Sequence, residues 1–173
     1  MEKQCISLIG MPASGKTTIA RLLSKKIKWP WLDTDHLLEA WYGICLEELK
    51  EKLGNESFIK AEEYIILHLD VKKFIIATGG SVIYSKSAMQ KLKNTAIVVY
   101  LQADLNTIKK RIEQNPKRGL IISPSQSLKE LYLERTPLYE KYADIKISTD
   151  NIDPHQCILE IAEKIKILKA SNP

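Results

Sequence analysis

Short apolar segments alternate with amphipathic segments along the whole chain. The first apolar run, Cys5–Ile9, is typical of a strand that is buried on both faces. Ile19, Leu22, Leu23 and Ile27 follow at the spacing of one helix face. The pattern as a whole predicts strands at 5–9, 31–33, 74–77, 96–101 and 145–147, and helices at 35–42, 46–69 (with a break at Gly54), 86–92, 105–112, 128–142 and through 158–168.

Strands that are separated by helices need crossover connections, which place the strands parallel and the helices on both faces of the sheet. We therefore expect an α/β fold with three layers, α/β/α, around a central parallel sheet of about five strands. The length of 173 residues suits a single domain over residues 1–173. Ligands of such sheets bind at the carboxyl ends of the strands, so candidate chemistry is sought there.

The composition is that of an ordinary globular domain, with 45% hydrophobic and 27% charged residues. The apolar run near the N-terminus is much shorter than a secretory or membrane-spanning segment, so we expect a cytoplasmic protein. Three widely spaced cysteines without CxxC or Cys–His neighbours predict neither a disulfide nor a zinc site. We expect them to be buried or half-buried thiols.

A phosphate-binding loop follows the first predicted strand directly. Residues 10–17, Gly-Met-Pro-Ala-Ser-Gly-Lys-Thr, satisfy the pattern GxxxxGK[ST] and lead into a predicted helix. Its glycines let backbone N–H groups turn toward one phosphate, Lys16 bridges the β- and γ-phosphates, and the Thr17 hydroxyl binds Mg²⁺. Ala13 stands where many such loops have another glycine, and its Cβ fits if the backbone there is right-handed. The nucleotide-binding residues predicted from this loop are Gly10, Ala13, Ser14, Gly15, Lys16, Thr17 and Thr18.

Two carboxylates follow the second predicted strand, in the run Asp33-Thr34-Asp35. Beside a phosphate loop they can divide the work of phosphoryl transfer. Asp33 would hold the water shell of Mg²⁺, and Asp35 would orient an acceptor hydroxyl and take its proton late in the reaction. The alternative is that Asp35 only caps the helix that begins there.

The segment from about 114 to 127 lacks either periodicity and contains Pro116, Gly119 and Pro124. A loop of this length inside a compact domain is usually functional, and we expect a lid.

The sequence resembles the shikimate kinases, a family within the nucleoside monophosphate kinase-like group of P-loop proteins, over nearly the whole chain. The motifs that carry the resemblance are the phosphate loop, the DxD of Asp33 and Asp35, the glycine motif at Thr78-Gly79-Gly80, the lid motif Arg118-Gly-Leu-Ile, and Glu134-Arg135-Thr-Pro-Leu-Tyr139 with Ala143-Asp144 after it.

The resemblance implies a P-loop NTPase fold, the use of ATP with Mg²⁺, and phosphorylation of one hydroxyl of shikimate, a step of aromatic amino acid biosynthesis. It also implies that Arg111 flanks the adenine, that Arg118 reaches the phosphates and the substrate, and that Pro154 lies in the loop beside the adenine. The implied site thus comprises catalytic Lys16, Asp35 and Arg118, the metal-binding residues Thr17 and Asp33, and substrate contacts from Asp35, Gly79, Gly80 and Arg135.

The chain departs from the family pattern at two positions. Ile59 stands where the family has an arginine that grips the carboxylate of shikimate, and an alkyl group cannot form those paired, charge-assisted hydrogen bonds. Lys60 is adjacent, but one residue turns about 100° around a helix, so it should not simply replace that arginine. Ser81 stands where the family usually has a third glycine.

Other functions therefore stay open. The chain could phosphorylate another small hydroxylated molecule, or it could bind nucleotide without catalysis. The net charge of +5 raises the question of nucleic acid, but the lysine pairs are dispersed and no recognition motif accompanies them. Nucleoside monophosphate kinases share the phosphate loop but not the run at 134–139. We expect a monomer that binds small molecules and has no nucleic-acid or membrane partner.

Overall fold

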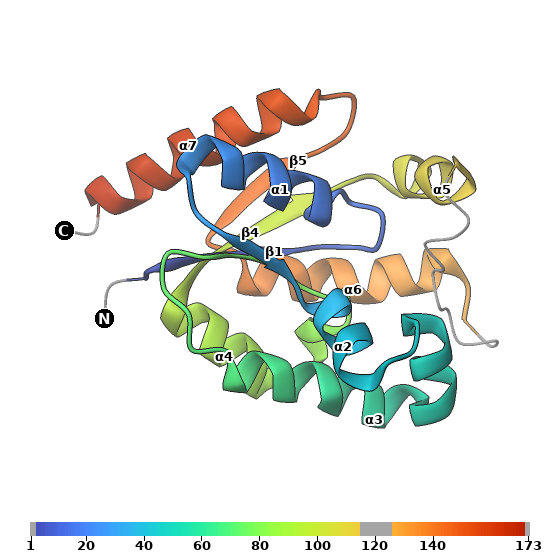
Figure 1. Cartoon of the computed structure of the whole chain (residues 1–173). Coiled ribbons are helices and arrows are strands. Elements are labelled where there is room, and N and C mark those ends of the chain that lie inside the picture. The colour runs from blue at the N-terminus through green and yellow to red at the C-terminus, as the bar shows by residue number, and fades with distance from the viewer. Residues whose placement is uncertain (1–2, 115–125, 172–173) are drawn as a thin grey trace.

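The computed structural model describes residues 3–114 and 126–171, with a parallel sheet at its centre (Figure 1). Five strands pair in the order β2-β3-β1-β4-β5, and every pairing is parallel. Their bounds are β1 Cys5–Ile9, β2 Trp31–Asp33, β3 Ile75–Ala77, β4 Ala96–Gln102 and β5 Ile145–Ser148. The expected α/β class with a central parallel sheet is confirmed.

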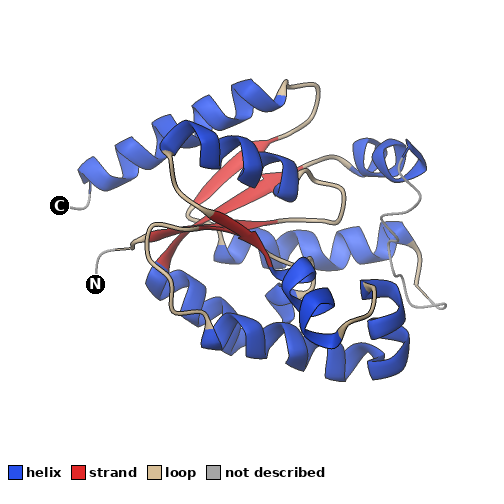
Figure 2. Cartoon of the chain, in the orientation of Figure 1, coloured by secondary structure: helices blue, strands red, loops and turns tan. Residues whose placement is uncertain are grey.

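Helices cover both faces of this sheet (Figure 2). Helices α1 and α7 lie on one face, while α3, α4 and α6 lie on the other (Figure 1). The described helices are α1 Lys16–Ile27, α2 Thr34–Tyr42, α3 Leu46–His68, α4 Lys86–Thr95, α5 Leu105–Gln114, α6 Leu128–Tyr142 and α7 Pro154–Ser171, with a short 3₁₀ turn, η1, at Val82–Tyr84.

The core has two layers because the side chains of a strand point alternately to its two faces. Ile6 and Leu8 of β1 pack in one cluster with residues of α1 and α7, and Cys5 and Ile9 pack in the other with residues of α4 and α6. Every residue of β1 is buried. The central strand is thus fixed from both sides, and so is the loop that follows it.

The chain path creates a crevice at the carboxyl ends of the central strands. The connection after β1 leads toward β2 at one edge of the sheet, and the connection after β4 leads toward β5 at the other. Loops that diverge in this way leave space between them for a ligand. The phosphate loop after β1 and the aspartates after β2 open at this end of the sheet.

Several elements differ from the sequence-based expectations. Helix α4 runs on to Thr95, and the turn η1 was not expected. Cys45 is exposed, contrary to expectation, whereas Cys5 and Cys157 are buried, and all three are free thiols. The expected break at Gly54 is confirmed, because Gly54 adopts φ 70° and ψ 168° within α3.

Two expectations fall on residues that are not described. The lid predicted over 114–127 lies almost entirely outside the described residues, and so does Arg118. None of the described helices has the length and apolar character needed to cross a bilayer.

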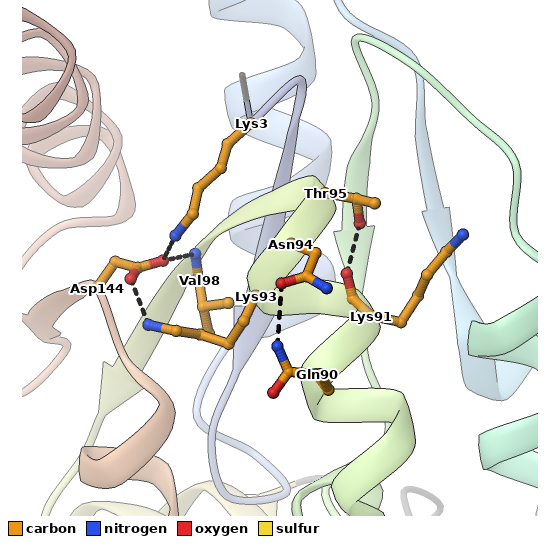
Figure 3. Close-up of polar contacts among 8 residues, drawn as sticks. All are labelled: Lys3, Gln90, Lys91, Lys93, Asn94, Thr95, Val98 and Asp144. Atoms are coloured by element: carbon orange, nitrogen blue, oxygen red, sulfur yellow. Dashed lines mark hydrogen bonds and ion pairs between the residues drawn. The ribbon is translucent and has the colours of Figure 1, made fainter. Parts of the chain in front are cut away.

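The carboxylate of Asp144 joins three parts of the fold at the amino end of the sheet (Figure 3). It accepts hydrogen bonds from Lys3 Nζ at 2.7 Å, Lys93 Nζ at 2.5 Å and the backbone N–H of Val98 at 2.9 Å. Burial alone would raise the pKa of Asp144, but the bonds from Lys3 and Lys93 outweigh it and hold the pKa below its ordinary value. Asp144 therefore ties the chain before β1, α4 and β4 to the start of β5.

Replacing Asp144 by Ala should lower the free energy of unfolding by about 2 kcal/mol, because it leaves two lysines and a backbone N–H without their acceptor. Urea denaturation at pH 7 measures the change. The control is Asp70→Ala at an exposed position, which should stay within about 0.5 kcal/mol of the wild type. Equal stability of the two variants would contradict a stabilising role for Asp144.

Candidate active site

The phosphate loop runs from the end of β1 to the start of α1 and depends on glycine at Gly10. Gly10 has φ +146°, and a Cβ there would lie 2.6 Å from the carbonyl oxygen of Leu101 in β4. Gly15, at the N-cap of α1, has φ +99°. The loop can therefore lie against β4 while the free N–H groups of the first turn of α1 face the crevice.

Ala13 does not have the right-handed backbone under which we expected its Cβ to fit. Its φ is +62°, which is the left-handed region. The physical reason is a tight turn, closed by a hydrogen bond from the Ser14 N–H to the carbonyl oxygen of Met11 at 3.1 Å, so alanine carries a strain of about 1 kcal/mol that glycine would avoid.

Lys16 is buried at the mouth of this loop, with 9% of its surface exposed. Its Nζ donates to the carbonyl oxygens of Gly10 and Met11, each at 2.9 Å. Burial lowers the pKa of Lys16 to about 8, although the negative charges of Asp35 and Asp33 act against the shift. The ammonium group of Lys16 is thus held against the phosphate loop by two carbonyl oxygens of that loop.

Asp33 connects the phosphate loop to the second strand. Its Oδ2 accepts a hydrogen bond from the Thr17 hydroxyl at 2.7 Å, and its Oδ1 accepts from the backbone N–H of Asp35 at 3.0 Å. Asp33 is therefore the residue that caps α2. The alternative role for Asp35, as a helix cap only, does not describe this structure.

The carboxyl groups of Asp35 and Glu62 meet above Gly79. A Cβ built on Gly79 would lie 2.0 Å from Glu62 Oε1 and 2.6 Å from Asp35 Oδ1, so both oxygens crowd the same point. Both are buried, and neither has a hydrogen-bond partner among the described residues. The other oxygen of Glu62 accepts from the Ser81 hydroxyl at 2.5 Å.

Burial of these two carboxyl groups changes their acidity. Burial, and then the charge of Asp33, raises the pKa of Asp35 to about 6. Burial, and then the charge of Asp35, raises the pKa of Glu62 to about 8. At neutral pH, Asp35 is mostly ionised and Glu62 mostly protonated, so the two close groups share one negative charge.

Arg135, on α6, lies close to Gly80 and to Pro12 of the phosphate loop, because a Cβ built on Gly80 would lie 3.1 Å from both Arg135 Nη1 and Pro12 Cδ. It is 7% exposed, its Nε donates to Tyr84 Oη at 3.2 Å, and its guanidinium lies 5.2 Å from the centre of the Tyr84 ring. Nearby, the Tyr139 hydroxyl donates to the carbonyl oxygen of Gly80 at 2.7 Å. These contacts position one cation and the glycine backbone side by side.

Two cavities meet at the phosphate loop. The first, of about 310 Å³, is lined among others by Lys16, Thr17, Asp33, Asp35, Glu62, Gly80 and Arg135. The second, of about 240 Å³, is lined among others by Ala13, Ser14, Gly15, Thr18, Arg111 and Pro154. Arg111 is held at the second cavity by hydrogen bonds to the carbonyl oxygens of Ala13 at 3.2 Å and Thr149 at 2.6 Å.

The structure therefore brings most of the predicted residues to two adjoining spaces. Gly10 and Gly79 line neither cavity; Gly10 packs behind the loop and Gly79 lies beneath the two carboxyl groups. Lys50 also lines the first cavity, although it was not predicted as a site residue. No local motif marks Lys50, because it reaches the site only through the kink at Gly54.

The two departures from the family pattern have different surroundings. Ser81 lines the first cavity and contacts Glu62. Ile59 is half-buried and lines a third cavity of about 320 Å³, which shares a wall with the first. Ile59 does not line the first cavity, which contains Lys16 and Asp35.

A parallel sheet with a phosphate loop after its first strand and an Asp-x-Asp run after its second defines a P-loop protein of the kinase type. The model of the shikimate kinase family matches residues 12–166. A shikimate kinase of Thermodesulfovibrio yellowstonii is 37% identical over 163 residues, which cover 92% of this chain and 91% of the relative. The chain belongs to the shikimate kinase family.

Solved structures agree with this assignment. A shikimate kinase from Acinetobacter baumannii in complex with shikimate matches with a TM-score of 0.82 at 31% identity, covering 98% of this chain and 94% of the other. The shikimate kinase of Aquifex aeolicus matches with a TM-score of 0.81 at 27% identity, covering 98% and 99%.

The raised pKa of Glu62 makes stability fall as the pH rises. The folded protein keeps this proton up to about pH 8, whereas the unfolded chain loses it near the ordinary value of 4.5. Between pH 6 and 8 this lowers the free energy of unfolding by up to about 1.4 kcal/mol per pH unit. The raised pKa of Asp35 also makes stability fall as the pH rises, but only below about pH 6. The lowered pKa of Lys16 makes stability increase as the pH rises, but only above about pH 8.

The variant Glu62→Gln should lose this pH dependence and keep the bond from Ser81. Urea denaturation from pH 6 to 8 should show the variant gaining stability relative to the wild type as the pH rises. Parallel pH profiles for the two proteins would contradict burial of a protonated carboxyl group at position 62.

Proposed function

We propose that this protein transfers the γ-phosphoryl group of ATP to a hydroxyl of shikimate, giving ADP and shikimate 3-phosphate. The observation that carries the proposal is the first cavity, which is lined by both the phosphate-loop lysine Lys16 and the half-buried carboxylate residue Asp35. A kinase needs this pairing, a cation for the moving phosphoryl group and a base for the acceptor hydroxyl. Membership of the shikimate kinase family supports the choice of substrate.

The nucleotide would span the two cavities. Its phosphates would lie against the backbone of the phosphate loop and the first turn of α1, with Lys16 moving from the carbonyl oxygens that it now contacts to the β- and γ-phosphates. The base would occupy the second cavity between Arg111 and Pro154, with Thr18 nearby. Arg118, outside the described residues, is proposed on the resemblance alone to reach the phosphates.

The residues around Thr17 and Asp33 fit Mg²⁺. Both present oxygen atoms, 2.7 Å apart, at the end of the cavity where the phosphates would lie. Among residues 3–114 and 126–171, no three His, Cys, Asp or Glu side chains form a metal site by themselves. This suits Mg²⁺, which is commonly held by one or two protein oxygens, phosphate oxygens and water. When bound, Mg²⁺ neutralises negative charge on the phosphates.

Asp35 is proposed as the group that orients the acceptor hydroxyl. Its pKa of about 6 leaves it mostly ionised at neutral pH and able to accept a proton as the new bond forms. The backbone at Gly80, which lines the first cavity, would support the ring of the acceptor, with Gly79 behind it beneath Asp35 and Glu62, and the guanidinium of Arg135 would contact the carboxylate of the acceptor.

A coupled assay of ADP release tests the proposal directly. Wild-type protein with Mg²⁺ and ATP should release ADP when shikimate is added and should release far less without it. The variant Asp35→Asn should lower kcat by about a hundredfold or more, because it cannot accept the proton, while ATP binding stays within about twofold. No turnover at millimolar shikimate would overturn the proposal.

The variant Gly79→Ala tests how closely the two carboxyl groups must be held. Its new Cβ would displace Glu62 and Asp35, so kcat should fall by about tenfold or more while the fold is kept, since the clash is with side-chain ends. Gly80→Ala is the graded comparison, because its Cβ would meet Arg135 and Pro12 only at 3.1 Å. Steady-state kinetics measure kcat for both variants, and a higher kcat for Gly79→Ala than for Gly80→Ala would contradict this account.

Phosphorylation of another small hydroxylated molecule is the second candidate function, and Ile59 is the observation that favours it. A screen of sugar acids and neutral polyols beside shikimate decides between the two. The variant Ile59→Arg belongs in the same screen. If Ile59→Arg is no more active with shikimate than the wild type, the lack of an arginine at position 59 does not limit the activity of the wild type.

A further inference from the structure

Two cations from different helices stand at the wall that the first and third cavities share. Arg135 comes from α6 and Lys50 from the first segment of α3. Both side chains line the first cavity and the third cavity. The residues shared by the two cavities are Lys50, Phe58, Ser81, Leu131 and Arg135.

The kink in α3 puts Lys50 there. Gly54 has φ 70° and ψ 168°, a backbone conformation that is essentially restricted to glycine, and it turns the segment before it relative to the segment after it. Leu49, 1% exposed, packs in a buried cluster with Phe58 from the other side of the kink. The Nζ of Lys50 lies 5.9 Å from the centre of the Phe58 ring. A buried neighbour thus fixes the backbone from which Lys50 extends.

The charges around Lys50 favour an anion at this place. Burial and then the positive charge of Arg135 lower the pKa of Lys50, while Glu62 acts against the shift. Glu62 itself holds its proton at neutral pH because its pKa is raised to about 8. The residues that line both cavities thus include two cations and no acid, and Glu62, which lines the first cavity only, is mostly neutral. Glu39 and Glu47 line the first cavity only, and Glu134 lines the third only.

We propose that Lys50 and Arg135 together bind the carboxylate of the acceptor, so that Lys50 supplies the positive charge that Ile59 does not. This inference rests on the proposed function and names its substrate class, a hydroxylated carboxylic acid rather than a neutral polyol. Lys60, next to Ile59 in sequence, cannot take this role, because it is exposed and pairs with Glu56 at 3.0 Å.

The test compares an acid with its neutral counterpart. Calorimetric titration with shikimate and with its carboxamide, in the presence of Mg²⁺ and ADP, measures binding without requiring turnover. The wild type should bind the acid at least about tenfold more tightly than the amide. Lys50→Met should lose most of this preference, Lys50→Arg should keep it, and Lys60→Met is the matched control on the same helix and should equal the wild type.

Kinetics separate a binding role for Lys50 from a merely structural one. In Lys50→Met the KM for shikimate should rise by about tenfold, while the KM for ATP and the kcat stay within about threefold. A variant that keeps the wild-type preference for acid over amide would overturn the inference, and so would a wild type that binds both ligands equally.

The outcomes also distinguish this inference from the proposed function. If the wild type prefers the acid through Lys50 but releases no ADP with it, the anion site stands and the proposed function fails. If the wild type phosphorylates shikimate but Lys50→Met keeps its preference for the acid, the proposed function stands and the role of Lys50 is wrong.

Discussion

The close approach of three chain segments at Gly79 is the constraint on which the rest of the site depends. The end of β3, the start of α2 and the middle of α3 converge there, and only a residue without a side chain leaves room for Asp35 and Glu62. Burying two carboxyl groups and a lysine together costs several kcal/mol unless their charges compensate one another. Burial is the largest cause of the raised pKa values of the two acids and of the lowered pKa of Lys16, and the attraction between Lys16 and Asp35 offsets it only in part.

The two halves of the site are built in different ways. The phosphate-binding part is local, because β1, the phosphate loop and α1 are continuous in sequence and Thr17 reaches Asp33 across the neighbouring connection. The acceptor half is assembled from distant segments, with Arg135 on α6 and Lys50 on α3. A site built from one continuous segment tolerates little change. A pocket assembled from several elements can take a positive charge from another element, as Lys50 does where position 59 is isoleucine.

The same difference decides how much could be predicted from the sequence. The strand pattern, the parallel sheet and the phosphate loop follow from periodicity and from one contiguous motif. The left-handed backbone at Ala13 could not be predicted from the sequence, because it depends on how the whole loop turns. Lys50 was missed because its position depends on the kink at Gly54 and on the packing of Leu49, which no spacing within α3 reveals.

Phosphorus NMR of the complete reaction tests the central claim, that the phosphate loop and Asp35 pass a phosphoryl group from ATP to a hydroxyl of shikimate. With enzyme, Mg²⁺, ATP and shikimate, the γ-phosphate signal should be replaced one for one by a phosphomonoester signal coupled to a ring proton. An unchanged γ-phosphate signal, or its conversion to inorganic phosphate alone, would contradict the account.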